Sequence, residues 1–213
     1  KKTFRVWCAV FKDIDTGEKI RLRPNELESI HSVVNSASML IAHNGIGYDF
    51  LVLKLYFGID YSINEYDYRK CKVGGKTMAV VDTMILSQYL QPDRLGGHSL
   101  KAWGVRLGIL KGSYGEDNEE AWDSFSEDML DYCDQDTEVT AATYKALMQE
   151  WGDWDHTPAF SMEQAMNEIV VRQEHIGFHF NSEQAKSALN DLNTKLEQIE
   201  NRVEPLLPKI KLA

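Results

Sequence analysis

Short apolar runs alternate with segments of helical periodicity along most of the chain. Apolar and polar residues alternate over residues 4–11, and a turn at 13–17 connects them to Lys19–Leu22, which predicts a β-hairpin. Met39–Ala42 and residues 78–82 are short apolar runs of the buried-strand type. Residues 60–76 and 111–123 are expected to be irregular. Apolar spacing and capping signals predict helices after Pro24, over Asp49–Phe57, between Asp82 and Tyr89, from Ser99 to Gly108, and from Ser124 to about Trp151.

The order of these elements predicts an α/β fold in which an antiparallel hairpin joins parallel strands. It resembles the ribonuclease-H-like arrangement, a mixed sheet with flanking helices, provided that one further strand precedes Lys1. That strand is central to such a sheet, because without it the neighbouring strands lose ladder partners and expose apolar faces. We therefore expect roughly a dozen further residues, including this strand, upstream of Lys1.

The pattern changes near residues 152–158, where a polar segment predicts a boundary. A helix is expected from Ser161 to Gly177, and a longer one from Asn181 carries a heptad of apolar residues up to Pro205. A heptad of apolar residues as regular as that of the second helix needs a partner surface to cover it. The segment therefore either packs back on the domain or belongs to a larger protein, and we favour the second interpretation. The apolar stripe of the first helix consists of Ala165, Met166, Ile169, Val170 and Ile176.

Composition places the chain among ordinary globular proteins, with 43% hydrophobic and 26% charged residues among 213. No run of eighteen apolar residues occurs, which excludes a membrane-spanning helix from the prediction. Three widely spaced cysteines without a metal-ligand pattern are typical of a cytoplasmic protein. The net charge of −10 argues against nucleic-acid binding, but only weakly, since bound divalent ions offset clustered carboxylates.

Two motifs carry the candidate chemistry. Residues 43–49 read His-Asn-Gly-Ile-Gly-Tyr-Asp and follow an apolar run, where an α/β sheet places functional groups. Tyr132 and Asp136 are four residues apart on a predicted helix, so their side chains leave the same face. Taken singly, each motif favours a structural interpretation: a polar turn with a helix-capping Asp49 for the first, and an ordinary half-exposed helix for the second. Together they provide two carboxylates and a phenol, as metal-dependent cleavage of a phosphodiester requires.

Other polar residues have simpler interpretations beside the functional ones. Asp82 is either a further metal ligand or, as we favour, a helix cap. His98 either orients its own loop, which we favour, or contacts substrate. Asp13 and Asp15 lie in a tight turn, where Asp is expected for turn reasons. Arg94, Lys101, Arg106 and Lys111 form either a basic edge for nucleic acid or scattered surface charge, and Asp131, Asp134 and Glu138 are read as a solvated face.

The two motifs together resemble those of the 3′–5′ proofreading exonuclease domain of family A DNA polymerases, particularly the replicative enzymes of podovirus-type phages. Residues 43–49 resemble the second exonuclease motif, and residues 132–136 resemble the third motif in its tyrosine subclass. The histidine subclass has a histidine where Asp131 stands. Residues 81–87, 97–108 and 172–178 also resemble the phage group, so the likeness covers nearly the whole chain. The first motif, Asp-x-Glu, is absent, and no polymerase palm or fingers follow.

This resemblance implies a site for two Mg²⁺ or Mn²⁺ ions that hydrolyses 3′-terminal phosphodiester bonds and releases nucleoside monophosphates. Asp136 would ligate the ion that holds the attacking water, and Asp49 would hold the second ion. Tyr132 would orient the water by hydrogen bonding. The last nucleotides of a single-stranded DNA 3′ end or frayed primer terminus would be positioned by Asn44, Tyr48 and His98.

The resemblance also divides the chain into an exonuclease domain over residues 1–155 and a helical connector over 156–213 that leads towards a polymerase domain. It implies a protein of the host cytoplasm, with DNA and its own polymerase domain as partners. Two alternatives stay open: a free-standing exoribonuclease of the same tyrosine subclass, and a non-catalytic exonuclease fold that acts as a scaffold for a polymerase.

Overall fold

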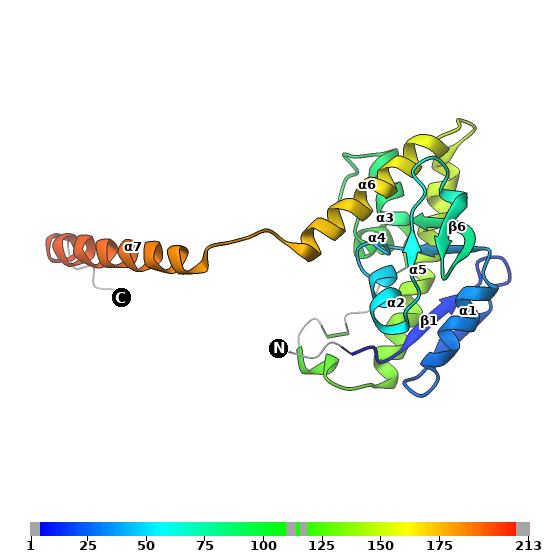
Figure 1. Cartoon of the computed structure of the whole chain (residues 1–213), viewed down its shortest axis with the longest axis horizontal. Coiled ribbons are helices and arrows are strands. Elements are labelled where there is room, and N and C mark those ends of the chain that lie inside the picture. Colours follow the sequence, from blue (N-terminus) through cyan, green and yellow to red (C-terminus); the bar gives the residue numbers. More distant parts are fainter. Residues whose placement is uncertain (1–4, 110–113, 116–118, 208–213) are drawn as a thin grey trace. The chain divides into compact units, whose positions relative to one another are not determined.

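The computed structural model describes residues 5–109, 114–115 and 119–207 of the chain. Two compact units are present, Lys1–Glu174 and His175–Ala213. The strands of the first unit are β1 (Ala9–Lys12), β2 (Lys19–Leu22), β3 (Met39–Ala42), β4 (Tyr61–Ser62), β5 (Cys71–Val73) and β6 (Lys76–Asp82) (Figure 1). Its helices are α1 (Ile30–Ser36), α2 (Asp49–Phe57), α3 (Thr83–Leu90), α4 (Leu100–Leu107), α5 (Glu127–Trp151) and α6 (Thr157–Ile176), with 3-10 turns at Leu27–Ser29, Tyr68–Lys70 and Glu119–Trp122.

The first unit contains a mixed sheet with flanking helices, as the sequence predicts. Four strands follow the order β3-β6-β5-β4, with β3 and β6 parallel and the other pairs antiparallel. The parallel register pairs Ala42 with Asp82, so the carboxyl ends of β3 and β6 lie side by side. Functional groups gather at this kind of edge in α/β proteins.

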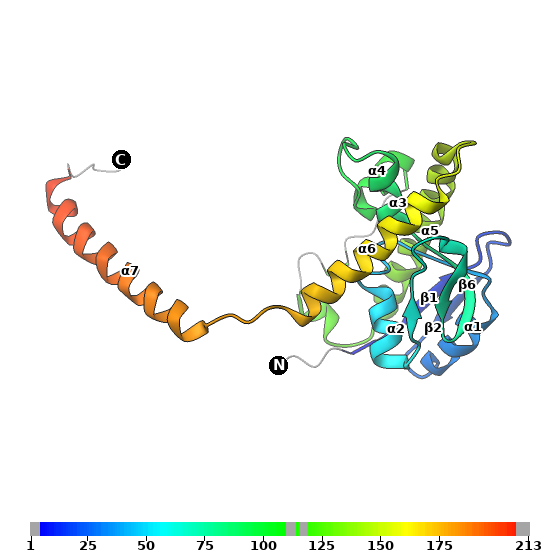
Figure 2. The ribbon, with the colours of Figure 1, turned by 45° about the horizontal axis from the view of Figure 1, so that its top comes forward.

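The β1–β2 hairpin forms a second, separate sheet beside α1 (Figures 1 and 2). Its first strand is shorter than the alternation over residues 4–11 predicts, because ladder pairing begins only at Ala9. No strand in the described residues joins the hairpin to the four-stranded sheet. A single sheet of ribonuclease-H-like order therefore stays a prediction.

Local signals placed most helices correctly. Ser99 accepts a hydrogen bond from the Ala102 backbone N–H at the start of α4, and Gly108 ends that helix at a left-handed φ of 68°. Gly58 closes α2 in the same way, with a φ of 63°. The helix expected from Ser124 begins at Glu127 instead, because Ser126 is the residue whose hydroxyl accepts from the Met129 N–H.

The segment 60–76, expected to be a loop, contains two short strands and a 3-10 turn. Cys71 and Val73 are buried while Lys72 between them is exposed, which is the alternation of a half-buried strand. Three residues are too few for this signal to stand out in the sequence. The segment 111–123 is described only in part, with Glu119–Trp122 forming its 3-10 turn.

Buried side chains lie on both faces of β6, and the helices around the four-stranded sheet complete the core, with α5 packed against β1, β3, α3 and α4. Fully buried side chains from sheet and helices contact one another there, so the two strand ends and α5 are held in fixed relative positions. Among them are Ile30, Val34, Phe50, Val80, Val81, Leu86, Trp103, Leu147 and Phe160.

Helix α6 begins earlier than predicted, and its apolar stripe is not its buried face. It begins at Thr157, and all of it up to Glu174 belongs to the first compact unit. The domain boundary expected at residue 155 stays a prediction. Ser161 and Gln164 are fully buried, whereas the residues of the predicted apolar stripe from Met166 to Ile176 are largely exposed: Met166 52%, Ile169 52%, Val170 42% and Ile176 72%. Figure 2 shows α6 crossing beside β6.

The second unit consists of α7 (Ser182–Val203) and a short 3-10 turn, Glu204–Leu206. Asn181 caps α7 by accepting a hydrogen bond from the Gln184 N–H. The heptad residues form one helix as predicted, and all of them from Leu189 to Val203 are exposed in the structure. No helix in the described part of the chain combines the length and apolar character of a membrane span.

Candidate active site

The turn between β3 and α2 places the first candidate carboxylate. Asn44 adopts a left-handed φ of 62°, and the Phe50 N–H donates to the Gly45 carbonyl at 2.9 Å, which folds the chain back into α2. A Cβ at Gly45 would lie 2.5 Å from the Ala42 Cβ, so only glycine fits there. Asp49 is consequently the first residue of α2 at the carboxyl edge of the sheet.

Asp82 holds this turn against the end of β6. Its side chain is fully buried and accepts hydrogen bonds from the backbone N–H groups of Asn44 at 2.9 Å and Ile46 at 3.1 Å. It also accepts from Met84 at 3.0 Å and Ile85 at 3.5 Å, which caps α3 as predicted. The additional role in the turn was missed, because a contact across thirty-eight residues leaves no local signal in the sequence.

The Thr83 side chain links the same two strand ends. Its hydroxyl donates to the Ala42 carbonyl at 3.2 Å and forms a 2.9 Å hydrogen bond with Nδ1 of His43. The first residue of the turn is therefore fixed by α3 as well as by β6.

The Asp49 carboxyl group lies in a strongly negative environment. Desolvation by the surrounding protein and the charges of Asp82 and Asp136 raise its pKa from 3.8 to about 7. The residue as a whole is exposed, so a soluble ion or substrate can reach it. Burial also raises the pKa of Asp82, although its four backbone hydrogen bonds favour the ionised form. The two motifs that are distant in sequence thus bring Asp49 and Asp136 into one electrostatic environment.

Helix α5 supplies Tyr132 and Asp136 one turn apart. The Tyr132 ring packs against Tyr114 and Trp122, with ring centroids 6.0 Å apart in each case. The helix is oriented by its contacts with β1 and β3. Desolvation and the negative charge of Asp49 raise the pKa of Tyr48, which places Tyr48 in the same environment.

Two cysteines adjoin the carboxylates. The Sγ atoms of Cys8 and Cys133 are 3.7 Å apart, and both residues are free thiols. The hydrogen bond to Cys8, burial and the negative charges of Asp136 and Asp49 raise the pKa of Cys133. Sequence reasoning treated the cysteines only as an indicator of compartment. The position of Cys133, three residues before Asp136, was the available signal.

The acidic face of α5 is paired with the hairpin and is not simply solvated as predicted. Lys19 contacts Asp134 at 2.5 Å and Glu138 at 2.8 Å, and Arg21 contacts both Asp131 and Asp134. These contacts fix β2 along α5. They also account for carboxylates near Asp136 that play no part in the candidate site.

Asp49 and Asp136 are the candidate metal ligands. Among the described residues, no three His, Cys, Asp or Glu side chains are grouped so as to hold a metal ion by themselves. Enzymes commonly bind Mg²⁺ through only one or two carboxylates together with substrate phosphates and water. The two carboxylates fit a Mg²⁺ or Mn²⁺ site of that kind, and a cation there would offset the negative charge that raises the pKa of Asp49.

Comparison with known proteins identifies the relatives of the chain. It is 24% identical to the DNA-directed DNA polymerase of Escherichia phage T7 over 246 aligned positions, which cover 90% of this chain and 33% of that protein. It is also 24% identical to the DNA-directed DNA polymerase of Enterobacteria phage T3, with 93% and 34% covered. The chain is homologous to phage DNA polymerases. It spans about a third of the length of these curated relatives, and no protein-family model matches it.

The homology supports the predicted relationship to family A phage polymerases, and it does not assign roles to individual residues.

His98 has both ring nitrogens engaged within the protein, with Ser87 Oγ at 2.9 Å and the Pro92 carbonyl at 3.0 Å. This arrangement supports the loop-orienting interpretation, and a contact of His98 with substrate stays a prediction. The Asn44 side chain is at the exposed surface of the turn.

Arg94 and Arg106, two of the four residues considered as a basic edge for nucleic acid, make contacts within the protein. Arg94 pairs with Glu150 at 2.6 Å and lies over the Trp103 ring, and Arg106 donates to the Gly97 carbonyl at 2.6 Å. These guanidinium groups stabilise the loop before α4. Lys111 lies outside the described residues.

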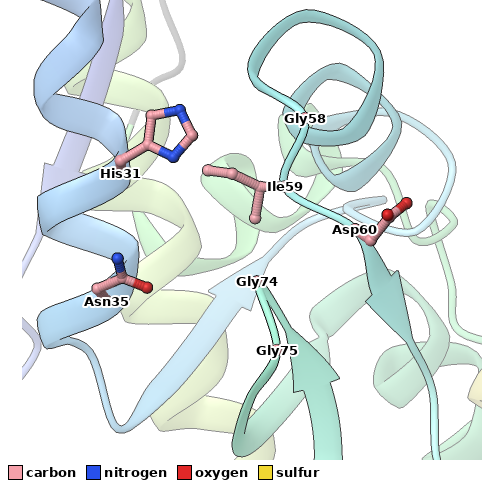
Figure 3. Close-up of a pocket in the computed structure, with 7 residues that line it drawn as sticks. All are labelled: His31, Asn35, Gly58, Ile59, Asp60, Gly74 and Gly75. Carbon is pink, nitrogen blue, oxygen red and sulfur yellow. The ribbon is translucent and has the colours of Figure 1, made fainter.

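A cavity of about 260 Å³ lies at the opposite end of β6 from Asp82 (Figure 3). It is lined by α1, the end of α2 and the turn at Gly74 and Gly75 that leads into β6. Figure 3 shows the Ile59 side chain between His31 and this turn, with Asp60 directed away. Since β6 extends over roughly 20 Å at ~3.3 Å per residue, this cavity is separate from the candidate site.

Proposed function

We propose that this chain is the 3′–5′ proofreading exonuclease part of a DNA-directed DNA polymerase, with a ribonuclease-H-like fold. Homology to two phage DNA polymerases associates it with DNA synthesis. The observation that carries the exonuclease assignment is that the charge of Asp136 contributes to the raised pKa of Asp49, although the two residues come from motifs far apart in the sequence. Carboxylates that raise one another's pKa are costly to keep ionised unless a cation offsets their charge.

The residues of the site would divide the work as follows. Asp136 and Asp49 would hold the metal ions, and Tyr132, one helical turn before Asp136, would orient the attacking water by a hydrogen bond. When bound, Mg²⁺ or Mn²⁺ lowers the pKa of a water and stabilises the negative charge that develops on the phosphate and the leaving 3′ oxygen. Tyr48, a residue that is 54% exposed, would offer a stacking surface to a terminal base, and Asn44 would offer a polar contact beside it.

The test is degradation of a 5′-labelled single-stranded DNA in the presence of Mg²⁺. The polypeptide carries this chain together with its natural neighbouring residues, and Asp136→Asn serves as a variant of equal shape. Lys19→Gln, which alters the ion pairs behind the same helix, is the matched control. We expect stepwise shortening from the 3′ end, a loss of at least roughly a hundredfold in the Asp136 variant, and little change in the Lys19 variant.

A parallel reaction with RNA of the same sequence separates the proposal from the exoribonuclease alternative. Faster shortening of RNA than of DNA would favour that alternative. No shortening of either nucleic acid by the folded wild-type protein would overturn the catalytic proposal, and the chain would then be a structural module of a polymerase.

A further inference from the structure

Helix α6 inserts a buried amide into the edge of β6. Gln164 is fully buried; its Nε2 donates to the Val80 carbonyl at 3.1 Å, and its Oε1 accepts from the Asp82 backbone N–H at 2.8 Å. The neighbouring strand β5 pairs with β6 only as far as Met78. The Gln164 side chain therefore replaces the missing strand partner for the last residues of β6, using one donor and one acceptor as a backbone amide would.

Asp82, whose backbone N–H is bound by Gln164, also binds the turn that precedes Asp49. The Asp82 carboxylate accepts from the Asn44 and Ile46 N–H groups, and this turn leads directly to Asp49. A continuous set of buried hydrogen bonds thus runs from α6 through the end of β6 to the turn. Buried networks of this kind are rigid when every member is satisfied.

The neighbouring polar residues on α6 bind backbone groups outside β6. Ser161, one turn before Gln164, accepts from the Tyr68 N–H at 2.7 Å and donates to the Thr157 carbonyl at 2.6 Å. Glu168, one turn after it, accepts from the Ile63 N–H at 3.0 Å. All three side chains face the same direction on the helix, and of the three it is Gln164 that contacts the strand end bearing Asp82.

We propose that Gln164 is a positioning residue for the candidate active site. It fixes the carboxyl end of β6 so that Asp82 holds the turn 44–48 in the geometry that presents Asp49. It thereby couples the orientation of α6 to the site. The effect on hydrolysis rests on the proposed function, whereas the effect on the turn is measurable without it.

The experiment compares amide hydrogen exchange of Asn44 and Ile46 in wild-type protein, Gln164→Met and Ser161→Ala. Methionine has nearly the length of glutamine without its hydrogen bonds, and Ser161→Ala removes a buried hydrogen bond from the same helix face. We expect exchange at Asn44 and Ile46 to be about tenfold faster, equivalent to ~1.4 kcal/mol, in Gln164→Met. Exchange is compared after the measured change in global stability of each variant is subtracted, and after this correction the two amides should keep the wild-type rate in Ser161→Ala.

A second readout is the Mn²⁺ affinity of the same proteins, measured by calorimetry, which we expect to weaken in Gln164→Met alone. If Gln164→Met does not fold, Gln164→Asn keeps the amide but is one methylene too short to reach both Val80 and Asp82, so faster exchange at the turn is again expected. Unchanged exchange at the turn in a folded Gln164 variant, or equal acceleration in Ser161→Ala, would overturn the inference. An inactive wild-type protein with the expected exchange pattern would instead overturn only the proposed function.

Discussion

The raised pKa of Asp49 predicts that the candidate site is maintained at the expense of stability. A carboxyl group whose pKa is about 7 in the folded protein and near 3.8 in the unfolded chain binds its proton more tightly when folded. The contribution of this protonated carboxyl group to the free energy of unfolding is therefore fully present below about pH 4 and is lost as the pH rises to about 7. The variant Asp49→Asn has no proton to lose, so it should be more stable than the wild type above pH 7.

The size of this effect follows from the same two values. The difference between 3.8 and about 7 is roughly three pH units, and each unit is worth ~1.4 kcal/mol, which gives an upper limit of about 4 kcal/mol. Asp49 is exposed as a residue, and solvent screens part of the repulsion from Asp82 and Asp136. After this discount we expect Asp49→Asn to raise the free energy of unfolding by about 1–2 kcal/mol at pH 8.

Urea denaturation of both proteins at pH 4 and pH 8, without divalent ions, measures the difference. The variant Asp60→Asn is the control, because Asp60 forms an exposed ion pair with Lys54 at 3.1 Å and such pairs contribute ~1 kcal/mol or less. We expect a gain for Asp49→Asn at pH 8 and no gain at pH 4. Saturating Mg²⁺ should abolish the gain at pH 8, because the ion stabilises the wild-type carboxylate by binding the folded state.

Equal or lower stability of Asp49→Asn at pH 8 would refute this reasoning, since it would mean that neither desolvation nor the neighbouring carboxylates disfavour the ionised form of Asp49. A gain of the same size at both pH values would also refute it. Such a gain would have to arise from side-chain packing or capping of α2, neither of which depends on titration.

Three further predictions concern the Asp82 hydrogen bonds, the pH dependence of metal binding and the end of α2. Asp82→Asn should lower the free energy of unfolding by about 2–4 kcal/mol in urea denaturation, because the carboxylate accepts from backbone N–H groups that the amide nitrogen cannot satisfy; an unchanged midpoint would contradict this. Mg²⁺ or Mn²⁺ affinity, followed by calorimetry, should fall about tenfold per pH unit below pH 7 as Asp49 takes up its proton, and a flat profile would show that Asp49 is not a ligand. Gly58→Ala should cost about 1 kcal/mol in thermal or urea denaturation through backbone strain alone, because a Cβ there meets no atom within 4 Å; a neutral result would mean that the φ of 63° relaxes.

Elements with a local cause could be predicted from the sequence. Ser99 and Gly108 bound α4 because a hydroxyl cap and a left-handed glycine act within a single turn. The strand Met39–Ala42 and the turn after it were predicted because an apolar run and glycines are read directly from the chain. The relation of Tyr132 to Asp136 was equally accessible, since it follows from helical geometry.

Features that depend on contacts between distant residues could not be predicted in this way. The role of Asp82 in the turn requires knowing that β3 and β6 are parallel neighbours in register, which neither strand reveals alone. The pairing of Lys19 and Arg21 with α5 turned an acidic surface into an interface. The approach of Cys8 to Cys133 depends on the packing of β1 against α5.

Hydrophobic periodicity alone does not determine which face of α6 is buried. Its apolar residues repeat at helical spacing, yet Ile169 is 52% exposed while Gln164 is fully buried. Burying Gln164 unpaired would be costly, so its two hydrogen bonds to β6 define which face of the helix turns inward. The strand edge beyond Met78 would otherwise keep unsatisfied backbone groups, and a polar side chain is the only kind that can satisfy them. The helix is therefore oriented by the requirements of the sheet, and the same requirement links it to Asp82 and the turn that presents Asp49.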